Sequence, residues 1–186
     1  YEDPLSLCLL FLSEKPKLHI KTEKDNLNGT IFEDRRHLFL HKDVKKVFEY
    51  LSNICNHVSA SQTSETIATN VGKFVDCSLN DYENNYWWPH YDMGYTAIIY
   101  LNYDDEENGT NLYEPLDNYP SNMPEEHIEP WISKKRFKLL KTLKPKYNRM
   151  VLFDAKKFLH GQHVSNKKYF ENEYRLNQVL FFEKNT

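Results

Sequence analysis

The sequence is poor in cysteine and contains no long apolar run. Its 186 residues include three cysteines, Cys8, Cys55 and Cys77, an odd number without the paired spacing of a zinc ribbon. This argues against a disulfide framework and predicts a reducing compartment, the cytoplasm. The apolar segment at residues 5–12 is much shorter than the roughly 18 to 20 residues that a membrane-spanning helix needs. No basic region precedes it, so it does not resemble a signal peptide.

An excess of positive charge is also absent. The chain has 24 Lys and Arg against 27 Asp and Glu, a formal net charge of -3. No global basic field therefore indicates a nucleic-acid or membrane partner. The acidic run at residues 104–107 lacks the alternating ligands of a calcium loop and is interpreted as a solvated loop.

Aromatic residues, in contrast, are plentiful, at 15% of the chain with 13 Tyr and 11 Phe. Such residues favour half-buried strands, and the length fits one domain over residues 1–186. Residues 1–60 are expected to form a helical buttress. Asp3 is placed to cap a helix that begins at Pro4, and apolar residues recur at helical spacing from about residue 42 to 57.

The remaining two thirds of the chain are predicted to form mainly β-strands. We predict a β core over residues 66–182, interrupted by an insertion at 102–144 that contains a charged helix from about 125 to 143. The expected strands are residues 66–75, 86–91, 95–101, 149–153, 159–164 and 174–182. Many short strands separated by turns predict a mainly β barrel or sandwich with flanking helices.

The segment His90-Tyr91-Asp92 is the most informative part of the sequence. Residues two apart on a strand point to the same face, so an imidazole and a carboxylate can share one metal ion. His160, which follows the expected strand at 149–153, supplies a second imidazole. Two histidines and one carboxylate suit Fe(II) and leave coordination positions open. Gly161 beside the ligand allows close backbone approach.

A cation is the next requirement of such a site. Arg175 begins an apolar strand, and its planar guanidinium is suited to the distal carboxylate of an iron-bound 2-oxo acid. Asn177 is two residues further along, on the same face, and is expected to add a hydrogen bond. Tyr100, on another expected strand, is a further candidate donor to the same carboxylate.

Together these motifs resemble the 2-oxoglutarate/Fe(II)-dependent dioxygenases, and more narrowly the prolyl-hydroxylase-like branch of small microbial or phage type. The resemblance rests on His90-Tyr91-Asp92, on His160 and on the segment from Arg175 to Phe182. It implies a double-stranded β-helix (jelly-roll) fold, the metal ligands His90, Asp92 and His160, and Arg175 as the 2-oxoglutarate anchor. It also implies O2 as co-substrate and a hydroxylated product.

The substrate class implied by this resemblance is an amino acid, a peptidyl side chain or a small metabolite. Prolyl 4-hydroxylases commonly carry Lys at the position of Arg175, which argues against peptidyl-proline. Two other functions stay open: a cupin-like metalloenzyme that does not use 2-oxoglutarate, and a non-catalytic barrel that binds a partner.

Several side chains have alternative interpretations. His163 competes with His160 as the third ligand, but an odd spacing places the two on opposite faces of a strand. Trp87 and Trp88 either line a substrate pocket or pack in the core. His37 and His41 are interpreted as a solvated or substrate-facing surface, because no third zinc ligand lies nearby. Arg35 and Arg36 are interpreted as salt-bridging residues, with contact to an anionic substrate near the mouth of the site as the alternative.

Overall fold

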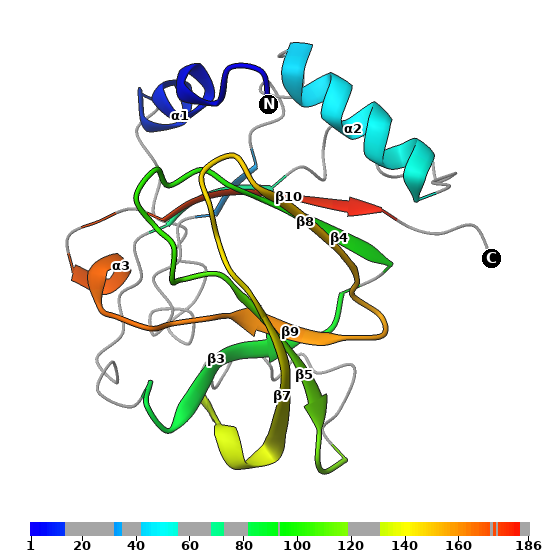
Figure 1. Ribbon diagram of the computed structural model, residues 1–186, viewed down its shortest axis with the longest axis vertical. Coiled ribbons are helices and arrows are strands. Elements are labelled where there is room, and N and C mark those ends of the chain that lie inside the picture. The colour runs from blue at the N-terminus through cyan, green and yellow to red at the C-terminus, as the bar shows by residue number, and fades with distance from the viewer. Residues whose placement is uncertain are drawn as a thin grey trace.

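A computed structural model describes residues 1–13, 32–34, 42–55, 68–72, 82–92, 94–118, 131–171, 173 and 175–182. The described chain is mainly β, with two five-stranded antiparallel sheets and few helices (Figure 1). The first sheet has the order β1 (Phe32–Asp34), β2 (Ala68–Gly72), β10 (Arg175–Phe182), β4 (Tyr95–Tyr100) and β8 (Met150–Asp154). The second has the order β6 (Trp131–Ser133), β3 (Asn85–His90), β9 (Leu159–Gln162), β5 (Thr110–Pro115) and β7 (Phe137–Leu143).

Two N-terminal helices lie where the sequence predicts them, whereas β1 is a strand within the stretch predicted as a helical buttress. Helix α1 spans Pro4–Ser13, and Asp3 caps it by accepting a 3.1 Å hydrogen bond from the backbone N–H of Ser6. Helix α2 spans Lys42–Ile54, and the short α3 spans Lys168–Glu171. No helix of the described segments is long and apolar enough to cross a membrane.

Strands β4 and β10 of the first sheet are buried on both faces, which explains their nearly continuous apolar sequences. On one face Leu180 and Phe182 of β10 pack with Leu51 of α2. On the other face Ile98 of β4 packs with Leu112 of β5 in the second sheet. The space between the two sheets is therefore lined by alternate residues of β4, β5 and β10.

The predicted charged helix at residues 125–143 is wrong in its described part, and residues 125–130 lie outside the described residues. Residues 131–143 form β6, a 3₁₀ turn at Lys134–Arg136 and β7. Strand β7 pairs with β5 from Thr110↔Leu143 to Pro115↔Phe137. Its lysines are accommodated because β7 is an edge strand. The stretch predicted as an insertion thus contributes β5, β6 and β7 to the second sheet.

Candidate metal centre

Three side chains from separate parts of the chain converge between the sheets. His90 ends β3, Asp92 lies two residues further on, and His160 lies in β9. Their ligand atoms all lie within 4.8 Å of one another. The Nε2 atom of His160 is 3.1 Å from Asp92 Oδ2, and Nε2 of His90 is 3.8 Å from Asp92 Oδ1. A single cation can therefore contact all three.

Asp92 does not lie on a strand, so the prediction that strand alternation orients it is wrong. Strand β3 ends at His90, two residues before Asp92. Its backbone N–H instead donates to the carbonyl of Ala155, at 3.2 Å, in the turn after β8. The hydroxyl of Thr96, in β4, donates to Asp92 Oδ2 at 3.0 Å and holds the carboxylate toward the histidines. Thr96 was not singled out from the sequence.

A β-bulge brings His90 to the same face as His160. Trp87 pairs with Gln162 and His90 pairs with His160, so β3 spans three residues where β9 spans two. The extra residue leaves Trp88 in the left-handed region with φ 49°, a conformation that costs roughly 1–2 kcal/mol for a non-glycine residue. Without the bulge, Pro89 would lie opposite His160 and His90 would point away.

Gly161 allows this bulge to form. A Cβ at position 161 would lie 2.5 Å from the carbonyl oxygen of Trp87 and 3.0 Å from that of Trp88. The first distance is too short for a real carbon–oxygen contact and the second is tight, so a side chain here would push β3 away from β9. The close approach predicted for Gly161 is therefore an approach to the backbone that positions His90.

We expect Gly161→Ala to weaken Fe(II) binding by about 10- to 100-fold, the usual cost of disturbing the residues that orient ligands. Overpacking also lowers the free energy of unfolding by about 1–3 kcal/mol. Gly109→Ala is a comparison variant with a larger clash, because its Cβ would lie 2.0 Å from the carbonyl oxygen of Leu143, which is not a residue of the metal cluster. Iron titration and urea unfolding of both variants test this, and equal Fe(II) affinity in the two variants would contradict it.

Hydrogen bonds to backbone carbonyls orient both imidazoles. Nδ1 of His90 lies 2.7 Å from the Trp88 carbonyl oxygen, and Nδ1 of His160 lies 3.3 Å from that of Phe158. Because a carbonyl oxygen only accepts, each Nδ1 carries the proton and donates it. Each Nε2 lone pair then faces Asp92. Two lone pairs and a carboxylate that point at one another require a positive charge between them, either a proton or a metal cation.

The three side chains of the cluster differ in their exposure to solvent. The side chain of His160 is 4% exposed, that of Asp92 is 21% exposed and that of His90 is 31% exposed. Solvent and small molecules therefore approach from the side of His90. Burial acts to raise the pKa of Asp92, but when the imidazoles are protonated the hydrogen bond from His160, the charges of the two histidines and the Thr96 hydroxyl outweigh it. The pKa of Asp92 thus lies below its ordinary value, and the carboxylate is an anion near neutral pH.

Arg175 and Asn177 lie on the face of β10 that is turned toward the second sheet. Asn177 pairs with Tyr100 of β4, and paired residues share a face. Arg175 is 8% exposed, and burial lowers the pKa of its guanidinium, opposed by the nearby Tyr100, Tyr169 and Asp105. The hydroxyl of Tyr100 lies 2.7 Å from that of Thr110 in β5. The buried cation predicted from the sequence is thus in the same inter-sheet space as the histidines.

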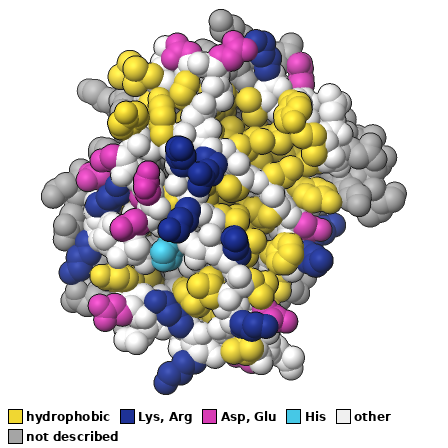
Figure 2. Space-filling model, in the orientation of Figure 1, with side chains coloured by type: hydrophobic (Ala, Val, Ile, Leu, Met, Phe, Trp, Pro, Cys, Tyr) yellow, Lys and Arg dark blue, Asp and Glu magenta, His cyan; other side chains and the backbone are white. Residues whose placement is uncertain are grey.

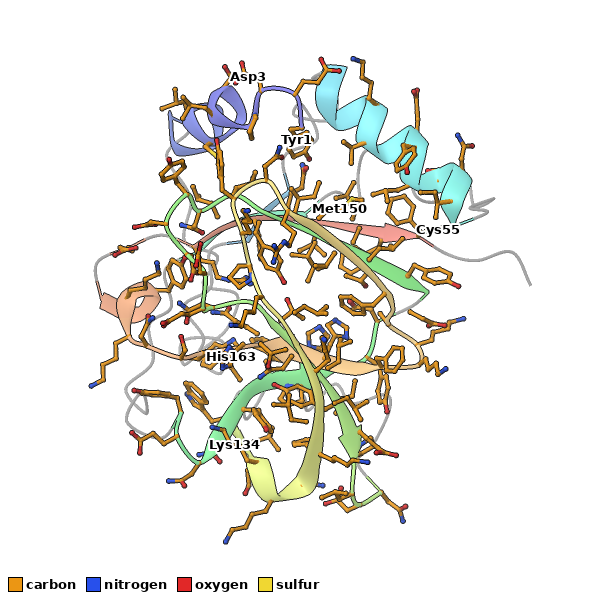
Figure 3. The ribbon with its side chains drawn as sticks, viewed as in Figure 1. Tyr1, Asp3, Cys55, Lys134, Met150 and His163 are labelled. Atoms are coloured by element: carbon orange, nitrogen blue, oxygen red, sulfur yellow. The ribbon has the colours of Figure 1, made fainter. Side chains whose placement is uncertain are left out.

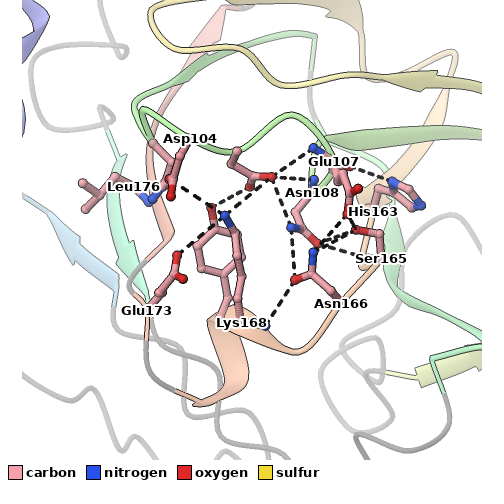
Figure 4. A network of polar contacts seen from close by, with 12 residues as sticks. Asp104, Glu107, Asn108, His163, Ser165, Asn166, Lys168, Glu173 and Leu176 are labelled. Atoms are coloured by element: carbon pink, nitrogen blue, oxygen red, sulfur yellow. Dashed lines mark hydrogen bonds and ion pairs between the residues drawn. The ribbon is translucent and has the colours of Figure 1, made fainter.

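A network of polar side chains surrounds the buried carboxylate of Asp105, near Arg175 (Figure 4). Asp105 is 4% exposed, so the interpretation of residues 104–107 as a solvated loop is wrong for this residue. Its Oδ1 accepts from the backbone N–H groups of Glu107 and Asn108, both at 3.0 Å, and its Oδ2 accepts from the Tyr169 hydroxyl at 2.5 Å. Asn108 in turn accepts from Ser165. The loop is thereby joined to α3, beside Arg175.

We expect Asp105→Asn to lower the free energy of unfolding at pH 7 by about 1.5–3 kcal/mol, the usual worth of a hydrogen bond to a charged group. Burial acts to raise the pKa of Asp105, but its hydrogen bonds and Lys168 lower it below 3.8 overall. The stabilisation is therefore complete above the unfolded-state pKa and is lost as pH falls through the folded-state pKa. Urea unfolding between pH 7 and pH 3 should show the difference from wild type shrinking, and a constant difference would contradict this.

The structure also places the other candidates. His163 is half-buried, outside the metal cluster, with Nδ1 2.9 Å from the Glu107 carbonyl oxygen (Figure 3). Trp87 is 4% exposed and packs edge-on against Trp131, with ring centroids 4.8 Å apart, which is core packing. Trp88 is half-buried. The remaining candidates lie outside the described residues: Arg35, Arg36, His37 and His41.

Comparison with known proteins adds no assignment. No protein-family model and no curated protein sequence matches the chain. The residues and their geometry are therefore the basis for any statement about function.

Proposed function

We propose that this protein is an Fe(II)- and 2-oxoglutarate-dependent dioxygenase that hydroxylates an amino acid, a peptidyl side chain or a small metabolite. One observation carries the proposal: the Nε2 atoms of His90 and His160 and the carboxylate of Asp92 converge within 4.8 Å. Two neutral imidazoles and one carboxylate on one side of an ion are the donor set of non-haem Fe(II) oxygenases. The fixed Nδ1 protons make both Nε2 atoms available as ligands.

The strand order supports a jelly-roll for the fold. Along the chain β2, β4, β8 and β10 belong to the first sheet, and β3, β5, β7 and β9 belong to the second. Neighbours in a sheet are far apart in sequence, as in β10 between β2 and β4, and β9 between β3 and β5. This is the arrangement expected when a long hairpin is wound into two facing sheets.

Each remaining residue has a role in the proposal. Arg175 binds the distal carboxylate of 2-oxoglutarate, and Asn177 or Tyr100, which share its face, add hydrogen bonds. Phe153 packs on His160, with ring centroids 4.8 Å apart, and excludes water from that side. When bound, Fe(II) and 2-oxoglutarate supply O2 activation and C–H oxidation, with succinate and CO2 as co-products.

Anaerobic titration tests the proposal. Purified protein is loaded with Fe(II), then 2-oxoglutarate is added while the visible spectrum is recorded. We expect saturable Fe(II) binding at one site per chain and a new charge-transfer band on addition of the 2-oxo acid. Fe(II) binding without any response to 2-oxoglutarate would favour a cupin-like metalloenzyme. Absence of Fe(II) binding would leave a non-catalytic barrel.

A further inference from the structure

Positive charge is concentrated in one part of the chain. Residues 131–157 contain ten of the 24 Lys and Arg but only one acidic residue, Asp154, of the 27 in the chain. The net charge of -3 therefore conceals a strongly basic segment in an otherwise acidic protein. Local fields, rather than net charge, decide which surface attracts an anion.

The fold places this segment along one side of the molecule. Strand β8 lies at one edge of the first sheet and β7 at one edge of the second, and residues 144–149 join them. The exposed cations along this side are Lys141, Lys144, Lys146, Arg149, Lys156 and Lys157, which we call the basic edge. Figure 2 shows Lys and Arg side chains gathered near the middle of the viewed face.

The cations of the basic edge are not neutralised locally. Within residues 131–157, Arg136 pairs with Asp117 and Lys138 pairs with Glu114. None of the six residues of the basic edge lies within ion-pair distance of a carboxylate of the described chain. Lysines on an edge strand discourage pairing between sheets. That role does not explain Lys144, Lys146, Lys156 and Lys157, because they lie in turns rather than on an edge strand.

Exposed aromatic rings lie beside these cations. Tyr103 is 83% exposed, and its ring centroid is 5.3 Å from that of Tyr147, between Lys146 and Asn148. A solvent-facing ring next to a row of cations combines a stacking surface with charge for phosphates. A run of Asp and Glu alone offers no planar rings for such a surface, and a duplex keeps its bases stacked inside.

We propose that the basic edge binds single-stranded nucleic acid, with phosphates on its Lys and Arg side chains and a base stacked on Tyr103. The edge also lies close to the metal centre. Lys141 pairs with Leu112, and Leu112 pairs with His160, so Lys141 is two strand spacings, about 10 Å, from the ligand. Binding itself does not depend on the metal.

The test is fluorescence anisotropy of a labelled 20-nucleotide single strand of mixed sequence with the 186-residue chain, with and without Fe(II). We expect binding whose affinity falls as salt rises, with a log–log slope of about -2 to -4 for three to five phosphate contacts. Lys144→Glu should weaken binding about 3- to 10-fold. Lys46→Glu, an equal charge change on α2, should alter it less than twofold.

Tyr103→Ala separates stacking from charge, and we expect it to weaken binding about 5-fold or more, with an unchanged salt slope. Equal affinity for a duplex of the same sequence, for polyglutamate or for anionic lipid vesicles would overturn the proposal, as would absence of binding. Because the measurement is made with and without Fe(II), loss of the iron site leaves its outcome unchanged. The test of this interaction is therefore independent of the test of the proposed dioxygenase activity.

Discussion

Asp92→Ala is expected to reduce 2-oxoglutarate-dependent succinate release by about 1000-fold or more. Asp92 is the only carboxylate of the three-residue cluster, and both histidines point their Nε2 atoms at it. Loss of one ligand of three removes several kcal/mol of metal-derived stabilisation, and about 4 kcal/mol corresponds to about 1000-fold in rate. Succinate release in air and Fe(II) titration under nitrogen measure the two consequences.

Asp117→Ala is the matched control for this variant. Asp117 is an exposed carboxylate that pairs with Arg136, at 2.7 Å, outside the metal cluster. Exposed ion pairs contribute roughly 0–1 kcal/mol, so this change should leave iron affinity and succinate release within twofold of wild type. Circular dichroism verifies that both variants fold. Substantial succinate release by folded Asp92→Ala would contradict the assignment of the metal ligands.

Arg175→Met is expected to raise the Kd for 2-oxoglutarate by about 100-fold and to leave Fe(II) affinity unchanged. Paired hydrogen bonds from a guanidinium to a carboxylate are worth about 3 kcal/mol in a buried setting, which corresponds to about 100-fold. Methionine keeps an apolar stem in the strand, so packing against the neighbouring residues is largely preserved. The charge-transfer band, titrated with 2-oxoglutarate, gives the Kd directly.

Two further variants make the result specific. Arg175→Lys keeps the charge but loses the planar fork, so we expect an intermediate loss of 2-oxoglutarate affinity. Arg136→Met removes an exposed arginine outside the metal cluster and should have no effect. If Arg175→Met binds 2-oxoglutarate as tightly as wild type, Arg175 serves only the packing around Tyr169 and Asp105. The anchor would then have to be sought elsewhere.

Variants at Asp92 and Arg175 together distinguish metal binding from 2-oxoglutarate binding in the proposed site. A variant at Asp92 should lose the metal and, with it, every signal that depends on 2-oxoglutarate. A variant at Arg175 should keep the metal and lose only the co-substrate. The reverse pattern would contradict the division of roles between the His-Asp-His cluster and β10.

The sequence by itself determined the features that follow from local rules. Asp3 caps α1 because a side-chain oxygen at that position reaches the first free N–H groups of a helix. Arg175 and Asn177 share a face because alternation along a strand is fixed by backbone geometry. The three ligand candidates and the approximate positions of β2, β3, β4, β8, β9 and β10 were also accessible, since residue type and spacing carry that information.

Only the tertiary structure decided the features that depend on distant partners. Residues 137–143 are a strand rather than a helix because β5 supplies hydrogen bonds that the local charge pattern does not reveal. His90 faces His160 because a bulge at Trp88 fits against Gly161, about 70 residues further along the chain. Asp105 is buried because Tyr169 reaches it from α3. Hydrogen bonds between distant strands are set by packing of the whole sheet, and no local spacing rule contains them.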